Sequence, residues 1–255
     1  MFIHVGKLNN YQGILDSIIN SVRDSGLYNE VDKICIGAAG TGSISNLPDK
    51  CVVVTDGSNI NAFERPTLTQ LQNHCREFPE GYTLYTHTKN ASLSIDDADP
   101  RRRDRWYFGE IHRKYMIYFM INKFRECIRV LDSGYTSVGC DFRNNPENSS
   151  HYAGNFWWVN NKFINTLPDI SGKMFSISGP FGDHPRHYCE RWLLCYNNKE
   201  NSQPTPRYNC PFWGAILRKS INNTKRLHNM SVTELHAYFD QELKRQKQPG
   251  YIPII

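Results

Sequence analysis

Strand-like and helix-like segments alternate along the first third of the chain, and this alternation constrains the fold more than any other sequence feature. Apolar residues recur every three or four positions over 11–25 and 65–78, which predicts two amphipathic helices. Around them, short apolar runs rich in β-branched residues predict buried strands at 2–5, 33–37, 51–55 and 82–88. Such alternation is typical of a mostly parallel sheet covered by helices, so we expect an α/β fold.

The remainder of the chain continues this pattern less regularly. Residues 106–131 form the longest predicted helix, and 136–142 predict a further strand. Shorter helices are expected at 162–167, 186–196 and 231–246. No repeat or linker divides the sequence. We therefore expect residues 1–255 to form one domain, with a helical C-terminal extension over about 210–255.

Composition narrows the function classes. The 255 residues are 39% hydrophobic, which suffices for a core, and the net charge of +5 suits an anionic ligand without indicating nucleic acid. Eight cysteines lack any C-x-x-C pair, so we expect reduced thiols and not a zinc site. The sequence shows neither a signal-peptide pattern nor an apolar run long enough to span a membrane. These features predict a cytoplasmic location and no membrane span.

The end of the fourth predicted strand carries the first candidate site. Parallel sheets bind ligands beyond the carboxyl ends of their strands, which directs attention to His4, Val5 and the segment His87-Thr88-Lys89. His87 and Lys89 are two positions apart and would share one face of the strand. Two cations there would suit a diphosphate. The alternative is an ordinary strand end with solvated polar residues.

The segment from His151 to Trp158 carries the second candidate site. Trp157 and Trp158 stand close to Gly154 and Asn155, and aromatic faces beside an amide are what a sugar-binding wall uses. The alternative is a packed core strand. At least one of the two tryptophans should face the core in either case, because neighbours on a strand point to opposite faces.

Glu190 is the third candidate. A carboxylate in an aromatic, partly apolar segment can act as a general base. The alternative is a salt bridge to Arg186 or Arg191.

An acidic and basic run is the fourth candidate. Asp96, Asp97 and Asp99 could hold a divalent cation, but the arginines that follow can neutralise them, and we favour a solvated loop. Arg101 and the next two arginines could close over phosphates as a lid.

In their order along the chain, these segments resemble a family. The chain is similar to GT-A-like glycosyltransferases of bacterial polysaccharide clusters and large DNA viruses, including those of algae. The similarity lies in the order of these segments: Tyr85-Thr86-His87-Thr88-Lys89, then Trp106 and Asp141, then Gly154-Asn155-Phe156-Trp157-Trp158 and Glu190-Arg191-Trp192. The resemblance covers about residues 2–195. It implies a three-layer α/β/α fold. It also implies transfer of a hexose or pentose from a nucleoside-diphosphate sugar to a glycan or glycoprotein, for capsid or surface glycans, in the host cytoplasm if the protein is viral.

The resemblance also implies roles for single residues. Most GT-A enzymes carry a metal-binding Asp-x-Asp where this chain has His87-Thr88-Lys89, so cationic side chains would replace the metal here. Whether the reaction depends on Mn²⁺ or Mg²⁺ stays open, and the aspartates of 96–99 could bind the metal in place of the Asp-x-Asp motif. Inverting members place a carboxylate base on a late helix, where Glu190 matches and Asp141 is second choice. Substrate contacts would include Arg101, Trp106 and His151.

Two other classes fit parts of the sequence. The tryptophan pair allows a carbohydrate-binding protein without catalysis, although the alternating strands and helices argue against a lectin-like, all-β module. The arginine run allows a nucleic-acid-binding protein, but the basic residues are scattered among acids and no recognition motif is present.

Overall fold

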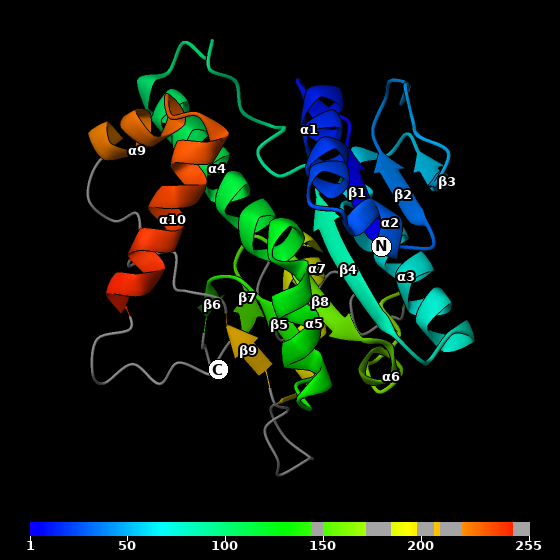
Figure 1. Cartoon of the computed structure of the whole chain (residues 1–255). Helices are drawn as coiled ribbons and strands as arrows, with labels where there is room; N and C mark the ends of the chain where they lie inside the picture. Colours follow the sequence, from blue (N-terminus) through cyan, green and yellow to red (C-terminus); the bar gives the residue numbers. More distant parts are fainter. Residues whose placement is uncertain (144–149, 172–184, 198–206, 210–220, 247–255) are drawn as a thin grey trace.

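A seven-stranded sheet forms the centre of the molecule in a computed structural model that describes residues 1–143, 150–171, 185–197, 207–209 and 221–246. The strand order is β3-β2-β1-β4-β8-β5-β9 (Figure 1). The strands are β1 (Phe2–Gly6), β2 (Ile34–Ala39), β3 (Cys51–Gly57), β4 (Tyr82–His87), β5 (Ser137–Gly139), β8 (Trp157–Asn160) and β9 (Arg207–Asn209). Strands β1 to β4 pair in parallel, as do β5 and β9, whereas β8 runs antiparallel to β4 and β5. The predicted α/β fold with a mostly parallel sheet is confirmed.

Helices connect and cover these strands. The longer ones are α1 (Tyr11–Asp24), α3 (Arg65–Glu77), α4 (Pro100–Ile117), α5 (Phe124–Asp132), α7 (Pro185–Arg191), α9 (Ile221–His228) and α10 (Val232–Gln246). Short elements are α2 (Leu27–Glu30), α6 (Asn161–Ile164), the 3₁₀ turns η1 (Ile60–Ala62) and η4 (Trp192–Asn197), and the π-helical turn η2 (Tyr118–Asn122). A small second sheet pairs β6 (Phe142–Arg143) with β7 (His151–Tyr152).

Alternate residues of the strands pack into two cores on opposite faces of the sheet. Ile3 and Val5 of β1 belong to the core that α1, α4, α5 and α10 cover. Phe2 of β1 and Tyr85 of β4 belong to the core that α3, α6 and α7 cover. Figure 1 shows α4 and α5 crossing one face of the sheet and α7 on the other. The arrangement is compatible with the three-layer α/β/α fold that we expected.

Capping residues explain where three of the helices begin or end. Helix α1 ends before Gly26, whose φ of +81° is readily adopted by glycine. Pro66 occupies the first turn of α3, where its missing N–H is tolerated. Ser231 and Glu234 form a capping box at α10: the Ser231 amide donates to Glu234 at 2.9 Å, and the Glu234 amide donates back to the Ser231 hydroxyl at 3.3 Å.

The start of α4 differs from expectation. For the run of aspartates and arginines we favoured a solvated loop, but α4 begins at Pro100 and includes the arginines. Asp99 is the N-cap, and its carboxylate accepts a hydrogen bond from the Arg101 amide at 2.9 Å. The predicted helix over 106–131 is instead α4, the π turn η2 and α5 in succession.

The C-terminal helices pack beside α4. Trp106 of α4 contacts His228 of α9 with ring centroids 5.0 Å apart, and Tyr118 bonds Asp240 of α10 at 2.5 Å. Strand β9 is not among the strands that the sequence predicted. Of the expected extension over 210–255, residues 210–220 and 247–255 lie outside the described part of the chain.

The cysteines and the helices of the described residues bear on two expectations, reduced thiols and no membrane span. The six cysteines whose side chains are described are free thiols, and the side chains of Cys195 and Cys210 lie outside that part. None of the described helices combines the length and the apolar character that crossing a membrane requires.

Candidate functional site

The topology brings most of the predicted site residues to one edge of the sheet. The carboxyl ends of β1, β4 and β5 meet the amino end of antiparallel β8 at this edge. His4, His87, Asp141 and Asn155 therefore come together from four segments of the chain. A gathering of polar side chains at the carboxyl ends of parallel strands is the usual place for a ligand in such sheets.

Lys89 is the central cation of this edge. Its side chain is half-buried, and loss of hydration lowers the pKa of its amino group, while the negative charges of Glu190, Glu64 and Asp141 oppose that change. Glu190 is paired with Arg186 at 3.4 Å, and Asp141 with Arg143 at 2.9 Å. Within the described residues Lys89 makes no ion pair of its own, so its ammonium is available to an anion.

His87 has a role different from the cation that we expected. Burial lowers its pKa to about 3, so the imidazole is neutral at physiological pH. Its Nε2 lies 2.8 Å from the Gly154 carbonyl oxygen and therefore donates its N–H to that acceptor. The expectation of a cation pair at positions 87 and 89 is thus wrong for His87, which instead anchors the turn before β8.

His4 is a second buried, neutral imidazole at this edge. Burial lowers its pKa to about 4, and its Nδ1 lies 2.8 Å from the hydroxyl of Thr67 at the start of α3. Thr67 approaches β2 so closely that a Cβ on Gly37 would meet its Oγ1 at 2.1 Å. Gly37 thus permits the close packing of α3 on the sheet.

A buried hydrogen-bond network centred on Glu64 supports the turn that His87 anchors. Glu64 Oε2 accepts from the Tyr85 hydroxyl at 2.7 Å and from Asn155 Nδ2 at 2.5 Å. Asn155 Oδ1 in turn accepts from Trp157 Nε1 at 2.7 Å. Asn155 has a φ of +57° and follows Gly154, whose φ is +98°. The network holds this left-handed turn, and both ends of the Asn155 amide are used within it.

The two tryptophans are core residues and do not form the sugar-binding wall that we expected. Trp157 stacks on Tyr85 with ring centroids 4.9 Å apart in one core. Trp158 lies in the other core and donates from Nε1 to the Met120 carbonyl at 2.7 Å. They do point to opposite faces, as predicted for strand neighbours, but both faces are covered by helices.

Of four further predicted contacts, three have structural roles and one is exposed to solvent. The Val5 side chain is buried in the core. Thr88 accepts from the Gly6 amide at 3.0 Å and so ties β4 to β1. Trp106 packs on α9, and the Arg101 side chain is 91% exposed on the first turn of α4. These positions therefore give no support to the expected substrate contacts.

The hairpin of β6 and β7 places His151 and Asp141 close to the site. His151 pairs with Arg143 across the two strands, and the Ala153 amide donates to the Asp141 carbonyl at 3.0 Å. Asp141 is only 1% exposed and has a strained φ of +52°. Its Oδ2 lies 3.9 Å from Nε2 of His112, a residue of α4 that the sequence did not single out. Burial and the nearby Lys89 hold the pKa of His112 well below its usual value.

Glu190 remains the more accessible of the two predicted bases. Its side chain is 21% exposed, against 1% for that of Asp141. The salt bridge to Arg186, given as the alternative role of Glu190, is present on the same helix. The Arg186 side chain of this pair is 51% exposed, and ion pairs near the surface contribute little stability.

Two of the three aspartates of 96–99 have partners within the loop and the start of α4. Asp97 bonds the side chain of Arg102 and the Asp99 amide, and Asp99 caps α4. The described residues include no group of three or more His, Cys, Asp or Glu side chains arranged to hold a metal ion. A divalent metal therefore has no preformed set of protein ligands there, and we derive no chemical step through one.

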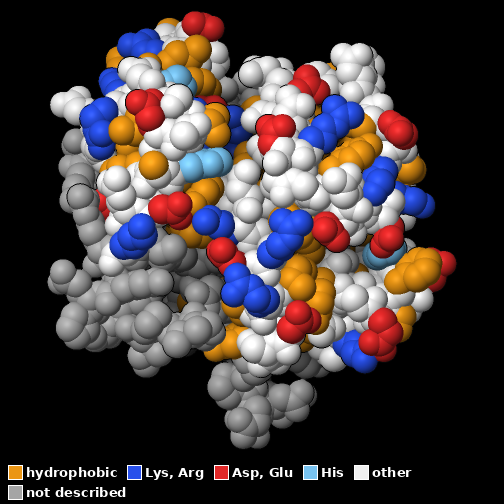
Figure 2. All heavy atoms as spheres, viewed as in Figure 1, with side chains coloured by type: hydrophobic (Ala, Val, Ile, Leu, Met, Phe, Trp, Pro, Cys, Tyr) orange, Lys and Arg blue, Asp and Glu red, His pale blue; other side chains and the backbone are white. Residues whose placement is uncertain are grey.

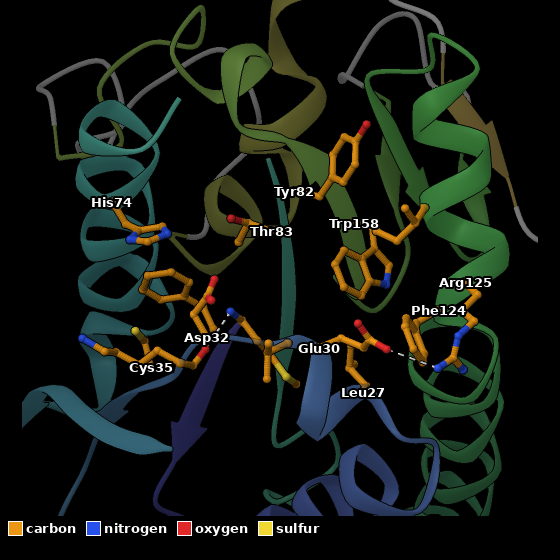
Figure 3. A pocket seen from close by; sticks show the side chains of 15 residues that line it. Leu27, Glu30, Asp32, Cys35, His74, Tyr82, Thr83, Phe124, Arg125 and Trp158 are labelled. Carbon is orange, nitrogen blue, oxygen red and sulfur yellow. Dashed lines mark hydrogen bonds and ion pairs between the residues drawn. The ribbon is translucent and has the colours of Figure 1, made fainter. Parts of the chain in front are cut away.

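A separate pocket lies at the opposite edge of the sheet (Figure 3). It has a volume of about 470 Å³ and is lined by the amino ends of β1, β2 and β4, with the Glu30–Arg125 ion pair at 3.4 Å on its wall. Of the predicted site residues only Trp158 reaches it. Its lining mixes both charges with aromatic rings and does not indicate a ligand class, so we locate the site at the carboxyl edge.

Comparisons with known proteins add no constraint. No family model, no curated protein and no solved structure matches this chain. On the face in Figure 2, Lys and Arg side chains are interspersed with Asp and Glu. A single basic patch, which nucleic acid requires, is not seen on that face.

Proposed function

We propose that this protein is a GT-A-like glycosyltransferase that moves a sugar from a nucleoside-diphosphate sugar to a glycan or glycoprotein hydroxyl, with inversion. The observation that carries the proposal is the position of Lys89 and Glu190 at the carboxyl edge of a mostly parallel sheet, where Lys89 makes no ion pair within the described residues. A cation for a leaving diphosphate and a base for an attacking hydroxyl are the two groups that this reaction needs.

The proposed step uses these two groups on opposite sides of the sugar. Glu190 accepts the proton of the acceptor hydroxyl as its oxygen forms a bond to the anomeric carbon. The bond from that carbon to the diphosphate oxygen breaks, and its electron pair stays with the diphosphate. Lys89 stabilises the charge that develops there, and attack from the face opposite the leaving group inverts the anomeric centre.

Neutral His87 supports this step without carrying charge. Its hydrogen bond to the Gly154 carbonyl fixes the turn near Lys89, so this part of the diphosphate site would be ordered before the donor binds. The alternative of a non-catalytic carbohydrate-binding protein depended on the tryptophan pair. Because both indoles are buried, that alternative has less support.

Calorimetry of nucleotide binding tests the proposal. UDP, GDP and TDP would be titrated into the wild-type protein and into Lys89→Gln, with EDTA and then with Mn²⁺. We expect one nucleotide to bind the wild type with EDTA present, and to bind Lys89→Gln more weakly. Equal binding by both proteins would remove Lys89 from the site, and binding of none would contradict the proposed donor.

A further inference from the structure

A buried ion pair on α4 contacts the backbone of Lys89, and the proposed mechanism does not use it. Glu110 and Arg113 are one helical turn apart, and the guanidinium of Arg113 donates to both carboxylate oxygens of Glu110, at 2.5 Å and 2.6 Å. The Arg113 and Glu110 side chains are only 6% and 11% exposed. Replacing a buried ion pair with apolar residues of similar size is often neutral or stabilising. The stability of α4 alone therefore does not explain this pair.

Both members of the pair reach out of α4 to the segment that follows β4. Arg113 Nη1 donates to the Lys89 carbonyl oxygen at 3.1 Å, and Glu110 Oε1 accepts from Asn90 Nδ2 at 3.0 Å. The same Asn90 amide donates to the Trp106 carbonyl oxygen, also at 3.0 Å. Three hydrogen bonds thus join α4 to two consecutive residues at the carboxyl edge of the sheet.

The backbone of this segment has an uncommon conformation and a close neighbour. Asn90 has a φ of +78°, in the left-handed region. Helix α4 can approach it because residue 109 is glycine: a Cβ on Gly109 would meet Asn90 Oδ1 at 2.1 Å. Glycine is unfavourable inside a helix, so this close approach explains its presence in α4. Lys89 is also held from its other side, since its amide donates to the His87 carbonyl at 2.7 Å.

We propose that Glu110 and Arg113 are positioning residues, which fix the peptide between Lys89 and Asn90 and thereby the direction in which the Lys89 side chain leaves the backbone. Arg113 holds the carbonyl of Lys89, and the His87 carbonyl holds its amide. A binding side chain needs such support from surrounding hydrogen bonds if it is to meet its ligand in one geometry. The inference rests on the proposed function only in the ligand that it gives to Lys89.

Hydrogen exchange of backbone amides tests this without any ligand. Mass spectrometry would compare the peptide over residues 88–93 with peptides of α4, in the wild type and in Glu110→Met/Arg113→Met. The turn amides of 88–93 donate to carbonyls within the same segment. We expect them to exchange about 10-fold faster in the variant, because the hydrogen bonds that hold the turn against α4 are lost. The amides of α4 should keep their wild-type rates.

The rates in α4 separate a positioning role from a merely structural one. If the pair served only to stabilise the helix, the α4 amides would exchange faster and the melting temperature would fall. Glu126→Met/Arg129→Met is the matched control, because this pair has the same spacing on α5 but its Arg129 and Glu126 side chains are 73% and 55% exposed. It should leave residues 88–93 at the wild-type rate. No acceleration over 88–93 in Glu110→Met/Arg113→Met, or equal acceleration there and in α4, would overturn the proposal.

Arg113→Lys covers the case in which the double variant does not fold. The lysine keeps Glu110 paired, but its single ammonium does not reproduce the guanidinium fork that contacts two carboxylate oxygens and the Lys89 carbonyl. We expect faster exchange over residues 88–93 here too, and a wild-type rate would overturn the proposal. In the wild type itself, amides of this segment that exchange as fast as those of an unfolded peptide would contradict it equally.

Nucleotide calorimetry connects the pair to Lys89. Whichever of UDP, GDP and TDP binds the wild type should bind Glu110→Met/Arg113→Met more weakly. Adding Lys89→Gln to that variant should cause no loss beyond that of Lys89→Gln alone, because the pair acts through Lys89. Additive losses would overturn the proposal. If none of the three nucleotides binds the wild type, the proposed function fails, whereas the exchange measurements still decide the role of the pair.

Discussion

Acidification from pH 7 to pH 5 should destabilise the protein through its buried histidines His4, His87 and His112, and for His87 and His4 the size can be worked out from their pKa values. Burial lowers the pKa of His87 to about 3 and that of His4 to about 4, from an ordinary value of 6.5. Both rings are nearly inaccessible, His87 at 9% and His4 at 5% exposure. The folded state therefore holds them neutral, whereas the unfolded chain binds a proton at each as the pH falls below 6.5.

The sign and size follow from proton linkage. Stability is fully present above pH 6.5 and is lost as the pH falls from there toward the folded values near 4 and 3. At pH 5 each histidine costs about 2 kcal/mol, so the pair costs about 4 kcal/mol. For a chain of this size that lowers the melting temperature by roughly 8–16 °C.

Carboxylates also take up protons between pH 7 and pH 5. The test therefore compares the acid-induced loss of stability in variants that differ by one histidine. Thermal unfolding would be followed by circular dichroism at pH 7 and pH 5 for the wild type and for His87→Gln. The variant should lose less stability on acidification by about 2 kcal/mol. His187→Gln, which replaces an exposed histidine of α7, is the control and should behave as the wild type does. Equal acid losses in His87→Gln and the wild type would refute the reasoning.

Three further predictions concern single side chains. Trp158→Phe leaves the Met120 carbonyl without its donor and should lower the free energy of unfolding by about 1–3 kcal/mol while nucleotide affinity is retained; denaturant titration and calorimetry check this. Lys89→Gln should weaken nucleotide affinity about 10- to 100-fold with an unchanged melting temperature, and an unaltered affinity would exclude an ionic role. Ser231→Ala removes the cap of α10 and should cost about 1 kcal/mol in urea unfolding, whereas Ser231→Asp should preserve stability.

Local signals in the sequence were sufficient for much of the fold. The spacing of apolar residues in α1 and α3 and the capping box of α10 each depend on contacts within a few residues. The arginine run concealed the start of α4, because charge suggested a loop. The N-cap Asp99 followed by Pro100 was the signal that could have located it.

The site was only partly predictable, because its contacts join distant segments. Lys89 and Glu190 stand out locally, the first at a strand end and the second in an aromatic segment. The bond from Asn155 to Glu64 spans 91 residues, and no local pattern specifies it. The tryptophan pair was misjudged since helices cover both faces of β8, which buries neighbouring side chains on each side.

A donor screen tests the central proposal most directly. The wild type and Glu190→Gln would be incubated with UDP-, GDP- and TDP-sugars, with and without EDTA, while release of nucleoside diphosphate is followed. The account predicts release from one donor class by the wild type that persists in EDTA, and release about 10²- to 10⁴-fold slower in Glu190→Gln. Equal rates in the two proteins, or release that depends wholly on Mn²⁺, would contradict the roles given to Glu190 and Lys89.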